Sequence, residues 1–192
     1  MNTRKILYLA VLVALMLVLQ LTGIGLINLG VINVTLYCTV IAIGELTLGL
    51  YAGVALGGIF GIISLLKALQ APTGLVVPIM TANPVYAAGM SLLPRLILPF
   101  VLWGIDRIGK DTKLAQALAA AGGSLCNTLL YLGMMLMGYR LFVTESTGVL
   151  GTVGTIALTA GIPEAIAAAL ITPPVVYALR KTIAPVQERK KQ

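Results

Sequence analysis

Apolar residues along this chain gather into six long stretches, separated by shorter segments that are polar or contain glycine and proline. Crossing a bilayer as a helix takes about 20 apolar residues, and all six stretches come close to that length. We therefore predict an all-α integral membrane protein, in which residues 1–192 form a single domain, a bundle of six transmembrane helices. The predicted spans are approximately residues 4–22, 35–51, 53–70, 89–108, 113–139 and 154–180.

Composition supports a membrane location and explains the strong positive charge. The chain is 59% hydrophobic and 10% charged, whereas soluble domains contain about 25% charged residues. Six spans put both termini on one side, and with cytoplasmic termini ten of the thirteen basic residues face inward. Because Lys and Arg are enriched in cytoplasmic loops, we predict a multi-pass protein of the plasma membrane with both termini in the cytoplasm. The basic residues form no continuous face, so no nucleic-acid partner is expected.

The N-terminal stretch TRKILYLAVLVALMLVLQ has the basic start and the apolar run of a secretory signal peptide. No small-x-small cleavage site follows it, because the chain continues QLTGIGLINLG. We therefore expect this stretch to be retained as the first span.

Residue types and motifs argue against an enzyme and against a bound metal or cofactor. The chain has no histidine, which is the commonest general base and metal ligand. Both cysteines fall within apolar stretches, so buried thiols are expected rather than a disulfide. Residues 104–110 match the GxxxxGK spacing of a phosphate-binding loop, but Asp111 stands where a magnesium-binding Ser or Thr is needed. This match is fortuitous, and any ATP that drives the protein must be hydrolysed by another subunit.

Three glycines, Gly53, Gly57 and Gly61, lie one turn apart on one face of the third predicted span. Small residues at this spacing let two helix backbones approach closely. We expect this face to pack inside the bundle, and a contact with a partner protein is the alternative.

Two long uncharged outer loops are candidates for lids. The first, TGIGLINLGVINVT, contains Asn28 and Asn33, and the second, APTGLVVPIMTANPVYAAG, contains Asn83 and three prolines that disfavour regular structure. Long loops without elements of their own are usually functional or disordered. We predict that both loops cover a pocket and that Asn33 and Asn83 contact its ligand; plain connecting segments are the alternative.

Four polar residues are predicted to lie at a similar depth in the outer half of the membrane: Arg95, Asn127, Tyr131 and Glu164. Ionisable groups inside a membrane almost always face the bundle interior or a wet cavity. One explanation is an ion pair between Arg95 and Glu164 that joins two helices. The other is a binding site in which Arg95 holds a carboxylate through its forked donors and the other three residues bind hydroxyl and amide groups. Glu45 on the second span is a further buried acid, either structural or part of the pocket wall.

The first span, with Ala10 and Ala14 four residues apart, resembles the AxxxA signature of the substrate-binding subunits, or S-components, of energy-coupling factor (ECF) transporters. The stretches VTLYCTVIAIGELTLGLYAGVALGGIFGIISLLKAL, LLPRLILP and GIPEAIAAALITPPVV also resemble the S-components that bind pantothenate and cobalamin. This resemblance implies capture of a vitamin at the outer face, followed by docking on a membrane scaffold (T) subunit that carries two cytoplasmic ATPase subunits. Ala10 and Ala14 would contact the scaffold, and packing within the chain is the alternative.

The aromatic content narrows the choice of ligand within this family. Flat ligands such as flavins usually need aromatic platforms, and this chain has one Trp, three Phe and seven Tyr. A pocket with few aromatic residues around Arg95 suits a small, flexible, hydroxylated carboxylate, so pantothenate is the leading candidate, ahead of cobalamin and riboflavin. The alternative from another class is a self-sufficient secondary transporter or channel, against which the lack of a visible inverted repeat argues.

Overall fold

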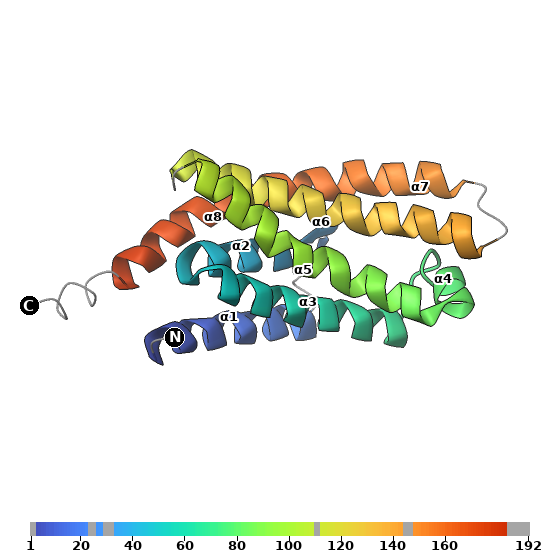
Figure 1. Cartoon of the computed structure of the whole chain (residues 1–192), viewed down its shortest axis with the longest axis horizontal. Helices are drawn as coiled ribbons and strands as arrows, with labels where there is room; N and C mark the ends of the chain where they lie inside the picture. The colour runs from blue at the N-terminus through green and yellow to red at the C-terminus, as the bar shows by residue number, and fades with distance from the viewer. Residues whose placement is uncertain (1–2, 23–25, 29–32, 110–111, 144–147, 184–192) are drawn as a thin grey trace, which may run out of the picture.

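The computed structural model describes residues 3–22, 26–28, 33–109, 112–143 and 148–183. Its elements are α1 (Thr3–Thr22), β1 (Leu26–Asn28), β2 (Asn33–Thr35), α2 (Tyr37–Leu48), α3 (Leu50–Gln70), α4 (Val77–Ala82), α5 (Pro84–Ile108), α6 (Lys113–Phe142), α7 (Val149–Ile156), the π-helix η1 (Ala157–Gly161) and α8 (Ile162–Ile183). The long helices lie roughly along one axis of an elongated bundle (Figure 1). We call the end where α1 begins and α8 ends the proximal end, and the end where α3 and α6 end the distal end.

Within the part of the chain that the structure describes, five stretches of helix are long and apolar enough to cross a membrane, which supports a multi-pass membrane protein. They are α1, α3, α5, α6 and the stretch Val149–Thr182, which joins α7, η1 and α8. The second predicted span contains α2, which has 12 residues. At 1.5 Å per residue this helix is about 18 Å long, shorter than the roughly 30 Å of a bilayer core. The count of six spans and the cytoplasmic position of the termini therefore stay predictions.

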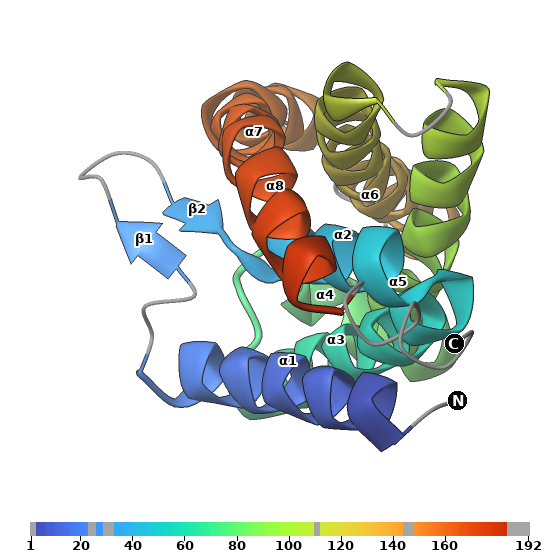
Figure 2. The same ribbon diagram turned by 90° about the vertical axis from the view of Figure 1, so that its left-hand side faces the viewer.

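The short helix α2 lies at the centre of the bundle, enclosed by other helices (Figure 2). It contacts α1, α3, α5, α6 and α8, and every one of its residues except Thr47 is buried. A helix that is apolar all round suits such an interior position. Gly49, at a φ of 99°, lets the chain turn directly from α2 into α3. Arg180 of α8 donates from Nε to the carbonyl oxygen of Leu46 at 3.1 Å, so the end of α2 is also tied to α8.

The three glycines of α3 pack against α5, which confirms the expected internal contact. A Cβ at Gly53 would lie 3.0 Å from Cβ of Pro99, and one at Gly61 would lie 2.9 Å from a Leu92 methyl group. At Gly57 an added Cβ would collide with the carbonyl oxygen of residue 95. The glycine row therefore sets the close approach of α3 and α5 inside this chain.

The two segments predicted as irregular outer loops contain regular structure. β1 and β2 form an antiparallel pair, with Asn28 opposite Asn33, so the all-α prediction missed two short strands. In the second segment α4 forms, and α5 begins at Pro84 rather than at residue 89. Pro78 and Pro84 occupy the first turns of these helices, where the missing N–H has no helical partner to lose. These prolines begin helices, contrary to the expectation that they prevent them.

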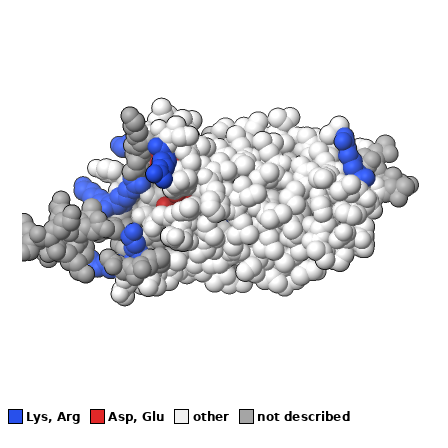
Figure 3. Space-filling view, in the orientation of Figure 1, with Lys and Arg blue, Asp and Glu red and all other residues white. Residues whose placement is uncertain are grey.

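Charged residues mark the ends of the bundle. Figure 3 shows Lys and Arg gathered at the proximal end and a further basic patch at the distal end, with a long uncharged surface between them. Near the proximal end, the Arg107 guanidinium lies 4.9 Å from the centre of the Trp103 ring, and the Lys113 ammonium lies 5.1 Å from that of Tyr177. Because Trp and Tyr concentrate at membrane interfaces, this level marks one edge of the apolar band.

Candidate functional site

Arg95 lies inside the bundle, where its side chain is 7% exposed. The guanidinium lies between two aromatic rings: its Cζ is 5.2 Å from the centre of the Phe60 ring and 4.4 Å from that of Tyr131. Contacts of this kind stabilise a desolvated cation by about 2 kcal/mol. Phe60 itself stacks on Tyr37 at a ring separation of 4.8 Å. The cation is therefore held between α3 and α6, and it does not face lipid.

The proline before Arg95 explains how a guanidinium fits at this depth. Pro94 lies inside α5 and has no N–H, so it cannot donate the helical hydrogen bond to the carbonyl of Met90, four residues earlier. Arg95 Nη1 donates to this same carbonyl oxygen at 3.1 Å. This hydrogen bond satisfies the backbone acceptor that Pro94 leaves open. It also gives the buried Arg95 guanidinium one of the acceptors that it needs.

A second proline fixes the backbone at Arg95. Pro99 is also inside α5, and by the same reasoning the carbonyl of Arg95 has no helical donor. Gly57 of α3 lies directly against this carbonyl oxygen, in the arrangement that favours a weak Cα–H···O contact between helices. The two prolines and the glycine together fix the backbone position from which the Arg95 side chain extends.

Helix α6 supplies Ser124, Asn127 and Tyr131, which share one face because they are spaced three and four residues apart. Asn127 is 6% exposed, and its Nδ2 donates to Sγ of Cys38 on α2 at 3.6 Å. Ser124 and Glu164 also lie beside the Cys38 thiol. Cys38 is therefore the point where α2 meets the polar face of α6.

Glu164 enters from the first turn of α8 and is 6% exposed. Its carboxyl group lies in the neighbourhood of the Arg95 guanidinium. The π-helix η1 comes directly before this turn, and single turns of π-helix are frequent at functional sites. The structure thus brings Arg95, Asn127, Tyr131 and Glu164 together, as the depth argument predicted, and their role in binding stays a prediction.

We call Cys38, Arg95, Asn127, Tyr131 and Glu164 the polar layer. It lies between two apolar clusters, a proximal one that includes Cys38 and a distal one against which Tyr131 packs. On each of the three long segments, the polar residue lies between a member of the distal cluster and a member of the proximal one. The order is Met90, Arg95, Leu98 on α5; Ala120, Asn127, Leu132 on α6, which runs the other way; and Val153, Glu164, Ala168 from α7 to α8.

The polar layer contains hydrogen-bonding atoms that the described residues leave unsatisfied. Arg95 Nε, a donor, and Asn127 Oδ1, an acceptor, are buried and have no hydrogen-bond partner within the described part of the chain. Buried polar atoms without partners are uncommon in native proteins and call for an explanation such as a bound ligand or water. In the same described ranges no group of three or more metal-binding side chains comes together.

Of the other predicted ligand contacts, Asn83 lies away from the polar layer, and the contact of Asn33 stays a prediction. Asn83 is the N-cap of α5, and its Oδ1 accepts from the N–H of Tyr86 at 2.9 Å. It is twelve residues from Arg95 along the helix, or about 18 Å. Asn33 begins β2, and its side chain lies outside what the structure describes. Glu45, at 4% exposed, packs against Gly53 near the end of α2, on the proximal side of Cys38.

Ala10 and Ala14 are both exposed on the outward face of α1. The helix is held to the bundle by its opposite face, where Leu12, Met16 and Leu19 are buried. Packing within the chain, the alternative explanation for the AxxxA pattern, therefore does not account for these two alanines.

Cys38 and Phe60 are not among the site residues that the sequence predicts. The sequence predicts only that Cys38 is a buried thiol, and it singles out no role for Phe60. A buried thiol and a buried ring carry no periodic signal that separates a site from a core. Their place beside Arg95 and Asn127 depends on the packing of α2 and α3 against α5 and α6.

The long apolar helices define a multi-pass membrane protein whose buried polar residues gather in one layer inside the bundle. A protein-family model for the substrate-specific component of ECF transporters matches residues 4–176. The chain therefore belongs to this family, whose members are substrate-binding transporter components that work with a scaffold and ATPase subunits. No curated protein matches the chain.

Proposed function

We propose that this S-component binds a small carboxylate vitamin in the polar layer, with pantothenate as the first candidate. The observation that carries the proposal is Arg95, a permanent cation that is 7% exposed and is held between two rings and a backbone carbonyl. Three contacts orient the guanidinium, yet its Nε has no partner among the described residues. A pre-oriented cation with donor capacity left over is suited to an anionic group.

The neighbouring side chains suit the rest of such a ligand. Asn127 offers a buried acceptor, Oδ1, to a hydroxyl or amide N–H of the ligand. Glu164 accepts hydrogen bonds from hydroxyl groups and stands close enough to the guanidinium to limit the net charge of the site. Tyr131 is half-buried, with its ring on the guanidinium. A ligand with a carboxylate, hydroxyl groups and an amide uses all of these groups, and pantothenate has each of them.

A ligand reaches this layer only when the segments around it move, because all of its members except Tyr131 are buried. β2 contacts η1 and α8, and α4 contacts α5 and α6. We propose these two segments, the β1–β2 pair and α4, as the lids that the loop lengths predicted. The ligand would then enter from the distal side, which in the predicted orientation is the outside of the cell.

Calorimetry on the purified full chain tests the choice of ligand. Pantothenate, cobalamin and riboflavin are titrated separately, and small molecules that co-purify with the protein are identified by mass spectrometry. We expect pantothenate to bind and to be the co-purifying molecule. Binding of riboflavin in place of pantothenate would contradict the carboxylate argument, because riboflavin has no carboxylate for Arg95 to hold.

For transport, we propose docking on a membrane scaffold (T) subunit with two cytoplasmic ATPase subunits, through the face of α1 that carries Ala10 and Ala14. Small exposed residues let a partner helix approach closely in lipid, and both alanines are exposed here. Vitamin uptake into liposomes is the test. We expect uptake only when the scaffold, both ATPases and ATP are present; uptake by this chain alone would instead indicate a self-sufficient transporter or channel.

A further inference from the structure

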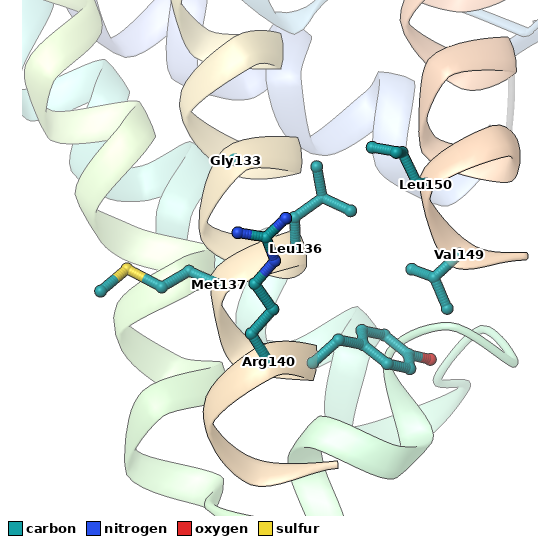
Figure 4. Close-up of a pocket in the computed structure, with 7 residues that line it drawn as sticks. Gly133, Leu136, Met137, Arg140, Val149 and Leu150 are labelled. Carbon is teal, nitrogen blue, oxygen red and sulfur yellow. The ribbon is translucent and has the colours of Figure 1, made fainter. Parts of the chain in front are cut away.

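A groove of about 480 Å³ lies between α6 and α7 near the distal end of the bundle (Figure 4). Its apolar lining comes from both helices: Gly133, Leu136 and Met137 of α6, and Val149 and Leu150 of α7. None of the polar-layer residues lines it. Met137 and Leu150 are 57% and 68% exposed, so the groove opens on the outer surface of the bundle, where lipid is expected.

Arg140 brings a positive charge into this apolar groove. Of the described residues that line the groove, Arg140 alone is charged. Its side chain runs back along α6, so that the guanidinium lies beside Leu136 (Figure 4). Across the described ranges, no hydrogen bond, ion pair or ring contact holds Arg140. A cation beside hydrocarbon is costly unless an anion or water compensates it.

The start of α7 adds a second positive element to the same groove. Gly148, at a φ of 84°, is the N-cap of α7 and provides no side-chain hydrogen bond. The first N–H groups of a helix have no partner inside the helix and carry partial positive charge. Val149 and Leu150, the first two residues of α7, line the groove. A guanidinium and a helix N-terminus therefore flank one apolar groove.

We propose that this groove binds one phospholipid with an anionic headgroup. The phosphate contacts Arg140 and the first turn of α7, since guanidinium groups and helix N-termini are both favourable partners for phosphate. An acyl chain lies along the apolar lining towards Gly133. A lipid fits better than a soluble anion, because every lining residue that the structure describes, apart from Arg140 and Tyr139, is apolar and the groove opens towards the bilayer. This site is independent of the proposed vitamin site.

Native mass spectrometry of the full chain in detergent tests the charge requirement. The probes are phosphatidylglycerol and phosphatidylcholine with identical acyl chains, and the readout is the fraction of protein that retains one lipid. We expect phosphatidylglycerol to be retained about fivefold better, the usual strength of one basic side chain at an anionic lipid. Arg140→Gln should abolish this preference. Lys67→Gln, which removes a basic residue in the last turn of α3 outside the groove, should leave it unchanged.

A second pair of variants tests the apolar part of the groove. A Cβ at Gly133 meets nothing within 4 Å, so Gly133→Leu places a bulky side chain in the groove and should reduce retention of both lipids. Gly104→Leu, at another open glycine on α5, is the control. Equal retention of the two lipids by the unmodified chain would overturn the proposal. A loss of the phosphatidylglycerol preference in Lys67→Gln as large as in Arg140→Gln would overturn it as well. Retention of glycerol phosphate to the same degree as phosphatidylglycerol, at the same concentration, would indicate a soluble anion and would also overturn the proposal.

Discussion

The polar layer and the outward face of α1 show opposite patterns of burial. Polar residues are buried in the first and large apolar residues are exposed on the second, which is the reverse of the usual pattern in soluble proteins. In the polar layer, Arg95, Asn127 and Glu164 are 7%, 6% and 6% exposed. On α1, the large apolar residues Leu7 and Val11 are 64% and 58% exposed. Lipid tails are as apolar as leucine, so an apolar side chain has little preference between lipid and the bundle interior. A polar side chain has a strong preference for the interior.

The difference teaches that the two regions recognise their partners by different physics. The polar layer offers charge and hydrogen-bonding atoms in a buried place, which suits a small polar ligand. The α1 face offers small side chains and a flat apolar surface, which suits another helix. Substitutions should therefore separate the two: those in the polar layer change vitamin binding, and those on α1 change assembly.

The largest effect is expected for Arg95→Ala. Removing one partner of a buried charged contact costs about 2–5 kcal/mol, so we expect pantothenate affinity measured by calorimetry to fall by that amount. Arg107→Ala, which removes a basic residue of the same helix near the proximal end, is the matched control and should bind normally. Assembly with the scaffold should be unaffected by both changes. Unchanged affinity in a folded Arg95→Ala protein would make Arg95 a structural clamp between α3 and α6.

Gly57→Leu tests whether the glycine row positions the polar layer. The new side chain would meet the carbonyl oxygen of Arg95, and overpacking of this kind costs typically about 1–3 kcal/mol. We expect a lower midpoint of thermal unfolding and weaker pantothenate binding. Gly58→Leu is the control one residue along the same helix, where the nearest atom to an added Cβ is a Leu96 methyl group at 3.9 Å. Equal effects of the two variants would count against a special role for Gly57.

Ala14→Trp tests the other side of the comparison. A bulky ring on the exposed face of α1 prevents close backbone approach by a partner helix, and we expect about tenfold weaker assembly with the scaffold, or about 1.4 kcal/mol. Pull-down of the complete transporter measures the assembly, and calorimetry should show normal vitamin binding. Leu15→Trp, at an exposed position 100° further round the helix, should assemble normally. A complex that survives Ala14→Trp intact would place the interface elsewhere.

The smallest effect is expected for Asn83→Ala. This variant decides whether the Asn83 side chain caps α5 or contacts the ligand. Loss of an N-cap costs about 1 kcal/mol, so the thermal midpoint should fall slightly. We expect pantothenate affinity to stay unchanged, because the side-chain oxygen is bonded to the N–H of Tyr86. Asn83→Ser, which keeps a capping oxygen, should restore the stability. A loss of pantothenate affinity in both variants would support the sequence-based prediction that Asn83 contacts the ligand.

Much of the bundle and of the polar layer was predictable from sequence, because the free-energy cost of placing a polar side chain against lipid rises with its depth in the membrane. A charged residue such as Arg95 within an apolar stretch must face inward, and helical rise places Asn127 and Glu164 at comparable depth. The glycine row of α3 was predictable for a related reason, since small residues at helical spacing mark close packing in lipid. These inferences need only the position of a residue along a helix.

The remaining features depend on contacts between segments far apart in the chain. Apolarity alone could not show that α2 is a short central helix while α1 is largely exposed, since both have the composition of a span. Cys38 and Phe60 join the site only through the packing of α2 and α3 on α5 and α6. The strands β1 and β2 and the helix α4 were missed because short elements depend on what they pack against.

The amino-acid sequence by itself determined that this chain is a membrane protein. It also determined which residues cannot face lipid and which glycines must pack against another backbone. Those are statements about single residues and their solvent, so local pattern is enough. Only the tertiary structure decided that the Arg95 guanidinium binds the carbonyl left open by Pro94, lies between Phe60 and Tyr131, and shares a layer with Cys38. In a bilayer every apolar face packs acceptably against lipid or protein, so the choice of neighbours is made by the few polar contacts and close fits of the folded bundle.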